Sequence, residues 1–369
     1  TKSGDTGHGT HVAGIVAAEN NNGVGVCGIA GGSGKGDGVK LMSIQIFKGE
    51  TSATTSGLVR AMQYAADNGA HISQNSWGYT SADAEGYPSY YLGPGNDKEY
   101  KQQLSSEAAA MDYFVKNAGE EDSPIDGGLL IFAAGNDTAP RPGYPAAYEP
   151  CVAVAAMSPS ALPAYYTDHG PGTDIVAPGG ESLYKNGEIL STVPAQFSES
   201  GKPNYGLMQG TSQACPHVSG VAALGLSYAK KLGKRYTAKE FRSMLLSATN
   251  DMTPYLKGSI TLQFTDGSKL TLDYPSYEGK LGGGYVDAYK LLLQVEGTPC
   301  KVVKAGEQVD VDLSIYFGEG IDYAQFVSAV VSDENSAGLT IGDYADGKFS
   351  IKADKVGNAT VTVTMLVGG

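Results

Sequence analysis

The stretch HGTHVAG at residues 8–14 and the stretch GTSQACPH at residues 210–217 decide what this sequence predicts, because each supplies one half of a nucleophilic centre. The first offers a candidate general base, His8, and the second a candidate nucleophile, Ser212. A serine hydroxyl attacks well only when a neighbouring imidazole accepts its proton. Attack on a carbonyl also needs hydrogen-bond donors aimed at the oxygen that becomes negative. The surrounding sequence must therefore supply those donors.

One set of donors is expected beside Ser212. The small, mostly apolar run PHVSGVAAL at residues 216–224 predicts a buried helix with Pro216 in its first turn. This places Ser212 at a helix N-terminus, where backbone N–H groups lack intrahelical partners and the helix dipole favours negative charge.

A second donor is expected at the end of a buried strand. The run LLIFAA at residues 129–134 is apolar throughout and ends in GND at residues 135–137. Such a run is typical of a strand covered on both faces in a parallel sheet. Ligand-binding groups of these sheets lie beyond the carboxyl ends of the strands, so the side-chain amide of Asn136 is a candidate donor.

With these motifs the chain resembles the subtilisin-like serine proteases over about residues 4–295. The likeness also includes NSWG at residues 75–78, YPA at 144–146 and GPGTDIVAPG at 170–179, in the order the family has them. The resemblance implies a three-layer α/β fold with a mostly parallel central sheet. It also implies a secreted endopeptidase that hydrolyses protein or peptide substrates through an acyl-enzyme intermediate.

The resemblance assigns roles to individual residues. His8 matches the general base, Ser212 the nucleophile and Asn136 the oxyanion-hole amide. The segment that pairs with the substrate backbone and walls the primary specificity pocket matches Ser76, Trp77 and Gly78. Much of the remaining pocket is expected from Gly135, Asn136, Gly143 and Tyr144, with Asp137 on the rim.

These pocket residues predict a substrate preference. Gly143 leaves room at the base and Trp77 gives an apolar wall, so large apolar or aromatic residues are expected before the cleaved bond. Asp137 is expected to add tolerance for Lys or Arg through partly screened attraction. Trp77 has a second interpretation as a plain core aromatic.

The chain departs from the family at the third catalytic residue. The family's aspartate lies in an Asp-Ser/Thr-Gly segment at the end of an early strand, a few tens of residues before the histidine. Asp5 has suitable neighbours but lies three residues from His8, so we interpret it as loop or N-cap chemistry. We expect an upstream segment of the same precursor to supply the aspartate and its strand. The alternative is a non-catalytic peptide-binding or scaffold protein with this fold.

No cofactor is expected for the chemistry, but a structural calcium ion is a candidate. The loop at residues 19–25 follows the His8 stretch where the resembled family often has a calcium loop, and Glu19, Asn21 and Gly23 are the candidate ligands. An ordinary Asn-Gly turn is the alternative. Zinc at His8 and His11 lacks a glutamate or third ligand nearby.

Composition limits the possible partners and location. The chain has 369 residues, 51 of them glycine, and a net charge of −13, which argues against nucleic acid or anionic membranes as partners. No apolar run approaches membrane-spanning length. An extracellular, cell-surface or periplasmic location is expected.

Several side chains carry simpler predictions. Cys27, Cys151 and Cys215 lie among small apolar residues and are predicted to be buried thiols. Packing is also favoured over a nucleophilic role for Cys215. His11 and His217 are expected to be buried and hydrogen-bonded, and His169 to be solvated in a loop.

The regular elements follow from periodicity. Residues 39–47, 58–68 and 70–75 predict strand, helix and strand, a βαβ unit. Residues 79–127 form a long insertion with helical spacing at 99–117. Its tyrosines at 87, 90 and 91 could face a peptide cleft or pack the loop. Residues 260–272 predict a hairpin.

A second domain is predicted after the protease-like one. The expected division is residues 1–297 and 298–369. Short alternating runs at 309–313, 326–331, 349–352 and 359–366 predict a small β-sandwich. Its last motif, GNATVTVT at 357–364, resembles the end of a bacterial immunoglobulin-like module, and a truncated module is one interpretation of its short length.

Overall fold

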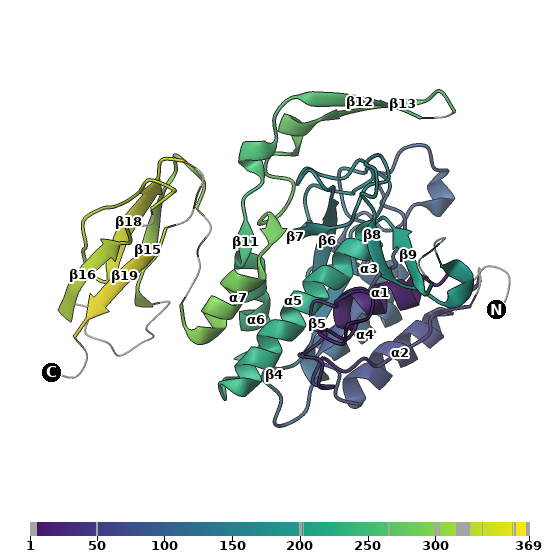
Figure 1. Ribbon diagram of the computed structural model, residues 1–369, viewed down its shortest axis with the longest axis horizontal. Helices are drawn as coiled ribbons and strands as arrows, with labels where there is room; N and C mark the ends of the chain where they lie inside the picture. Colours follow the sequence, from purple (N-terminus) through teal and green to yellow (C-terminus); the bar gives the residue numbers. More distant parts are fainter. Residues whose placement is uncertain are drawn as a thin grey trace. The chain divides into compact units, whose positions relative to one another are not determined.

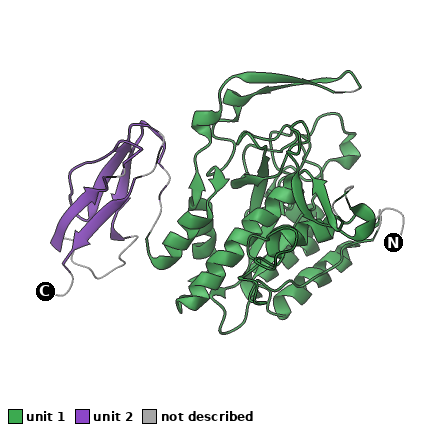
Figure 2. Ribbon diagram, in the orientation of Figure 1, with its two compact units in different colours: residues 1–300 green, residues 301–369 purple. Residues whose placement is uncertain are grey.

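The computed structural model (Figure 1) describes residues 6–48, 51–198, 201, 203–264, 266–298, 301, 303–314, 325–333, 335–355, 357 and 359–366. The chain divides into two compact units, residues 1–300 and 301–369 (Figure 2). This division lies three residues from the predicted one. Asp5 and Cys300 lie outside the described residues.

The first unit is built on a six-stranded sheet with the order β11-β14-β7-β6-β5-β3. Figure 1 labels β11, β7, β6 and β5 of this sheet. The five strands from β14 to β3 are parallel to one another, and β11 pairs antiparallel with β14. Their bounds are β3 Ile72–Asn75, β5 Leu129–Ala133, β6 Cys151–Met157, β7 Ile175–Pro178, β11 Thr249–Asn250 and β14 Tyr285–Val286. The predicted, mostly parallel sheet is confirmed.

Strand β5 shows why the predicted run is apolar throughout. Leu129 and Ile131 face a core that includes residues of α5 (Thr211–Lys231), α6 (Ala238–Ser247) and α7 (Ala288–Glu296). Leu130 and Phe132 face a second core with residues of α2 (Thr55–Asp67) and α4 (Ser105–Asn117). Because helices cover both faces, alternate side chains enter different cores and both must be apolar. The three-layer fold is thereby explained.

The remaining elements connect and flank these layers. Helix α1 (His8–Ala17) packs against α5 and β8 (Ile189–Thr192). The others are β1 Phe47–Lys48, β2 Thr51–Ser52, η1 Ser89–Tyr91, α3 Asp97–Gln103, β4 Ile125–Asp126, η2 Ala195–Phe197, β9 Tyr205–Met208, β10 Tyr236–Thr237, η3 Thr253–Tyr255, β12 Ser259–Gln263, β13 Lys269–Asp273 and η4 Tyr274–Tyr277. Strands β12 and β13 confirm the predicted hairpin. Helices α3 and α4 confirm the helical part of the insertion.

The predicted βαβ unit is only partly correct. Its helix and second strand are confirmed as α2 and β3. Its first strand is wrong, since residues 39–46 form no strand and β1 pairs only with β2, outside the central sheet. A strand needs a partner for its backbone N–H and C=O groups, and the described sheet ends at β3. The apolar side chains of Leu41 and Met42 are therefore 53% and 41% exposed.

The prediction that all three cysteines are buried is wrong for Cys27. Cys151 and Cys215 are buried, whereas Cys27 is exposed. The cause is the next residue, Gly28, which donates its N–H to Ala18 O at 2.9 Å and lies so close to α1 that a Cβ atom would approach Ala18 N to 2.4 Å. Because Gly28 faces inward, Cys27 faces outward.

The second unit contains two small antiparallel sheets. One has the order β15-β18-β17 and the other pairs β16 with β19. Their bounds are β15 Gln308–Asp312, β16 Phe326–Val331, β17 Leu339–Ile341, β18 Lys348–Ala353 and β19 Val361–Met365. Residues of both sheets pack on one core around Val311, Phe349 and Ile351.

In the described part of the chain, no helix combines the length and apolar character needed to cross a bilayer.

Candidate active site

Ser212 is the second residue of α5, as predicted from the apolar run after it. Its backbone N–H lies in the first turn of the helix, where no intrahelical acceptor exists. The residue before the helix, Gly210, has φ of 144°, a backbone conformation that side chains disfavour. The chain therefore turns sharply into the helix and presents the Ser212 hydroxyl at its N-terminal end.

Pro216 lies deeper in α5 than predicted, because the helix begins at Thr211. Proline has no N–H, so the carbonyl oxygen of Ser212, four residues earlier, receives no helical hydrogen bond from it. Ser76 Oγ donates to this oxygen at 2.7 Å, and Gln74 Nε2 donates to Ser76 Oγ at 2.8 Å. Because Pro216 leaves this oxygen without a helical donor, Ser76 can bond it and link the start of α5 to the residue that follows β3.

The side chain of Asn136 is held in one orientation. Its amide oxygen accepts hydrogen bonds from Thr211 N at 2.8 Å and Thr211 Oγ1 at 3.0 Å. Thr211 Oγ1 also accepts from Gly135 N at 3.2 Å. These bonds fix the orientation of the amide, and its NH2 group has no acceptor among the described residues, so it can donate to a bound ligand. Asn136 and the first turn of α5 can together offer two donors to one oxygen, which is the arrangement of an oxyanion hole.

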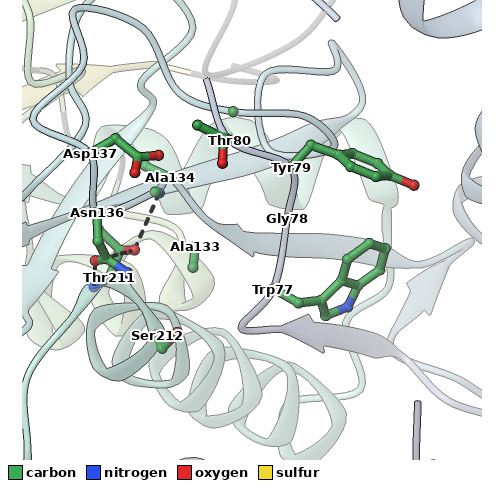
Figure 3. Close-up of a pocket in the computed structure, with 12 residues that line it drawn as sticks. Trp77, Gly78, Tyr79, Thr80, Ala133, Ala134, Asn136, Asp137, Thr211 and Ser212 are labelled. Carbon is green, nitrogen blue, oxygen red and sulfur yellow. Dashed lines mark hydrogen bonds between the residues drawn. The ribbon is translucent and has the colours of Figure 1, made fainter. Parts of the chain in front are cut away.

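A pocket of about 180 Å³ opens beside these donors (Figure 3). Pockets that enclose a whole small molecule are typically about 300–1,000 Å³, so this one suits a single side chain of a peptide. Figure 3 shows Asn136, Asp137 and Thr211 on one side of the pocket and Trp77 and Tyr79 on the other. The lining residues are Trp77, Gly78, Tyr79, Thr80, Ala133, Ala134, Gly135, Asn136, Asp137, Gly143, Thr211 and Ser212.

Trp77 takes part in both the pocket and the core. The residue is among those that line the pocket, and its ring meets Phe132 edge-on, with centroids 5.4 Å apart. Gly143 lines the pocket as well, but a Cβ atom there would lie 2.1 Å from Tyr79 O. Glycine is therefore required for close approach of the Tyr79 backbone.

His8 is the first residue of α1 and is half-buried, but it does not line the pocket. Burial lowers the pKa of His8 below its ordinary value, so its neutral, proton-accepting form dominates at pH 7. Its ring has no hydrogen-bond partner among the residues that the structure describes. One ring nitrogen is therefore available to a further acceptor.

The other histidines test three predictions. His11 is buried and its Nε2 lies 3.0 Å from Ile189 O, as expected. His217 is half-buried, with Nδ1 2.8 Å from Gln213 O. The prediction that His169 is solvated is wrong, because its ring packs on Tyr277 with centroids 4.3 Å apart. The N–H of Gly170 donates to Lys280 O at 2.8 Å, and this bond helps to hold the segment of Tyr277 against the loop.

The candidate calcium loop has a mixed fit to a cation. Glu19, Asn21 and Gly23 are exposed, and Asn22 Oδ1 accepts from Val24 N at 2.9 Å in a local turn. Asn20 Oδ1, by contrast, is buried and accepts no hydrogen bond from any residue that the structure describes. Over the described ranges, no three His, Cys, Asp or Glu side chains converge as metal ligands. The unpaired amide oxygen is the feature that fits a hard cation.

Tyr87, for which the sequence leaves a cleft-facing and a loop-packing interpretation open, donates its hydroxyl to Asp137 Oδ1 at 2.8 Å, at the pocket rim. Two further residues near the pocket are not indicated by the sequence. Glu107 is buried, and its carboxylate accepts from Tyr79 and Tyr100 at 3.0 and 2.9 Å. Asp168 is buried beneath Asn136. No local motif marks these residues, because the groups they contact at the site lie elsewhere in the chain.

Comparisons with known proteins give a family match for most of the chain. The model of a family described as "Subtilase family" matches residues 1–273. Alkaline elastase YaB from Bacillus sp. strain YaB is 33% identical over 60% of this chain and 45% of that protein. The extracellular basic protease of Dichelobacter nodosus is 30% identical over 68% of this chain and 36% of that protein. The chain thus spans less than half the length of these two curated relatives.

A solved structure gives the same result for the fold. The proteases from Pseudoalteromonas arctica PAMC 21717 superpose with a TM-score of 0.52 and 26% identity. The match covers 79% of this chain and 72% of the other. It extends beyond the pocket to most of the first unit's length.

Proposed function

Because this chain belongs to the subtilase family, we propose that it is a serine endopeptidase that forms an acyl-enzyme at Ser212. The observation that carries the proposal is the locked amide of Asn136, whose oxygen is held by Thr211, the residue next to Ser212. A protein that only bound peptides would need neither a nucleophile nor an oriented donor beside it.

The chemistry follows from the groups present. Ser212 Oγ attacks the substrate carbonyl carbon while His8 accepts the hydroxyl proton. The carbonyl oxygen becomes negative and is stabilised by the amide of Asn136 and the N–H of Ser212. The C–N bond then breaks as His8 returns the proton to the leaving amine. Water, deprotonated by His8, releases the acyl group and regenerates the serine.

The aspartate that orients the base is proposed to come from a separate segment of the same precursor. Two features support this. The ring of His8 has no partner among the residues described, and in the described sheet β3 is an edge strand, paired on one side only. A strand added at β3 would pair these backbone groups, and a carboxylate at its end would accept from His8.

The test is fluorophosphonate labelling of the protein purified from its source, with intact mass and N-terminal sequencing of every peptide present. Labelling of Ser212 in a sample that contains an aspartate-bearing peptide supports both proposals. Labelling without such a peptide or covalent extension contradicts the proposed segment. An unlabelled sample that contains the segment favours the non-catalytic scaffold.

Substrate preference follows from the pocket. We expect cleavage after large apolar or aromatic residues, with a minor share after Lys or Arg drawn by Asp137. Removing the charge with Asp137→Asn should lower that share about two- to fivefold, since an exposed charge pair contributes less than about 1 kcal/mol. A peptide library cleaved by both variants measures the change.

Tyr87→Phe is the matched variant for this prediction. It keeps the charge of Asp137 but removes the hydroxyl that donates to it. The share of Lys and Arg should therefore rise. A wild-type profile confined to Asp or Glu before the cut would reject the whole account of the pocket.

A structural calcium ion in the loop at residues 19–25 is also proposed, supported by the unpaired oxygen of Asn20. Chelation is expected to lower the melting temperature by on the order of 5 °C, because loss of a bound ion removes a few kcal/mol of stability. Asn20→Ala should lower it similarly and should abolish the response to chelator. A melting temperature that ignores chelator in the wild type would exclude the site.

Location and the second unit complete the proposal. We propose secretion to an extracellular, cell-surface or periplasmic location, supported by the extracellular protease among the relatives. We also propose that residues 301–369 are an immunoglobulin-like module, supported by two antiparallel sheets that share one core. Cell fractionation tests the proposed location. Separate expression of residues 301–369 tests whether the second unit folds as a module.

A further inference from the structure

Asp168 lies fully buried beneath the loop that carries Asn136. Its Oδ1 accepts hydrogen bonds from Asp137 N at 2.8 Å and from Ala139 N at 2.9 Å. Its Oδ2 is buried without a hydrogen-bond partner in the described part of the chain. A Cβ atom on Gly135 would lie 2.0 Å from this oxygen, so glycine is required there for the carboxyl group to fit. The carboxyl group thus touches the loop on both sides of Asn136.

The loop held by Asp168 has a strained backbone. Thr138 has φ of 57°, which is rare for a β-branched residue, and Gly135 has φ of 126°. The two N–H groups bound by Asp168 belong to the residues that flank Thr138. Such conformations cost about 1–3 kcal/mol and persist only where surrounding contacts impose them. Asp168 provides two of those contacts.

Backbone hydrogen bonds dock the segment of Asp168 on the same loop. Asp168 N donates to Gly135 O at 3.1 Å, and His169 N donates to Ala139 O at 3.0 Å. In the opposite direction, Thr138 N donates to Tyr166 O at 3.0 Å. The two segments therefore move together, and a change at Asp168 is transmitted to the position of Asn136.

We propose that Asp168 is a positioning residue of the oxyanion hole, which holds the loop of Asn136 in its strained, donor-presenting conformation. This inference rests on the proposed function, since an oxyanion hole has meaning only for an acyl-transfer enzyme. Asp168 itself touches no reacting atom.

The charge state of Asp168 gives this role a pH signature. Burial, the largest cause, raises the pKa of Asp168 to about 8; the Asp137 carboxylate adds to the rise, and the N–H groups of Ala139 and Asp137 oppose it. Among the described residues, Tyr87 also interacts electrostatically with Asp168, and His169 follows Asp168 in the chain. Hydrogen bonding to Asp137 raises the pKa of Tyr87, and burial lowers that of His169, so both are neutral near pH 8.

The charge state of Asp168 sets the direction in which kcat changes with pH. Below pH 8 the neutral carboxyl keeps Oδ1 as the acceptor of both N–H groups. Above pH 8 an ionised carboxylate places negative charge next to the loop that must stabilise a negative oxyanion. The value of kcat is therefore expected to fall on the alkaline side, with a midpoint near pH 8. The acid limb belongs to His8 and lies below its ordinary pKa.

Two variants test the proposal in the complete, fluorophosphonate-reactive protein. Asp168→Asn matches the neutral carboxyl in shape and keeps the acceptor oxygen. It should retain kcat within about threefold at pH 7 and lose the alkaline limb. Asp168→Ala removes the acceptor and should lower kcat about 10- to 100-fold with KM changed less than about threefold.

Asp174→Asn is the control for a half-buried, hydrogen-bonded carboxyl group outside the loop. Asp174 accepts from Ala153 N at 2.9 Å and pairs with Arg242 at 3.1 Å, so its loss should affect stability but keep the alkaline limb. An alkaline limb unchanged in Asp168→Asn would overturn the pH signature. Wild-type kcat in a folded Asp168→Ala variant would overturn the positioning role. A wild-type protein that fails to label with fluorophosphonate would instead refute the proposed function.

Discussion

Ser212→Ala is expected to abolish fluorophosphonate labelling and to lower peptide hydrolysis by on the order of 10⁶-fold, a magnitude carried over from subtilisin. No other described nucleophile can replace it at this turn. Cys215, one helical turn further along α5, is fully buried, and burial raises the pKa of its thiol to about 11. The thiol therefore stays protonated and unreactive at neutral pH. Mass spectrometry of labelled protein and initial rates on a peptide substrate measure the effect.

Cys215→Ala is the matched control. It removes the competing nucleophile but leaves Ser212 and its donors in place, so labelling and turnover should remain. Stability should fall, because the thiol contacts Asn75 O and Ile131 O at 3.5 Å in a closely packed helix start. If Ser212→Ala kept its activity while Cys215→Ala lost it, the assigned nucleophile would be wrong.

The sequence predicted the elements whose patterns are complete within one segment. The apolar run of β5 indicated a strand covered on both faces, and the small residues after Ser212 indicated a buried helix. These patterns hold because the side chains that define them all lie in the element itself. The start of α5 was placed too late, because Thr211 supplies no apolar signal.

Three other predictions fail because the outcome depends on a contact outside the segment itself. Residues 39–46 have strand composition but no strand to pair with, and composition cannot reveal that. His169 was predicted to be solvated, yet Tyr277 covers it from more than 100 residues away. Cys27 faces outward because its neighbour Gly28 contacts α1. Each outcome depends on a contact that local patterns do not encode.

The same limit applies to the candidate site. The residues that could act on a substrate were found from motifs, because their chemistry requires particular residue types. The residues that hold them were not. In the sequence, Asp168 is one polar residue in a loop and Glu107 is one charged residue on an amphipathic helix. Only the fold shows that both side chains are buried. Supporting residues are chosen by their three-dimensional surroundings, so the structure was needed to find them.

Asn136→Ala is expected to lower kcat about 100- to 1,000-fold with little change in KM, a range carried over from the family's oxyanion-hole asparagine and equal to about 3–4 kcal/mol of transition-state stabilisation. The amide meets its oxygen fully only when that oxygen is negative, so the loss falls on kcat. Thr211→Val is the graded comparison: it removes the hydroxyl that orients the amide but keeps the backbone N–H bound to the same oxygen. Its loss should be about tenfold, between wild type and Asn136→Ala. Acylation rates measured in single turnovers separate this effect from product release. An Asn136→Ala variant that acylates at the wild-type rate would mean that the negative oxygen is stabilised by other groups, and the mechanism built on this loop would have to be abandoned.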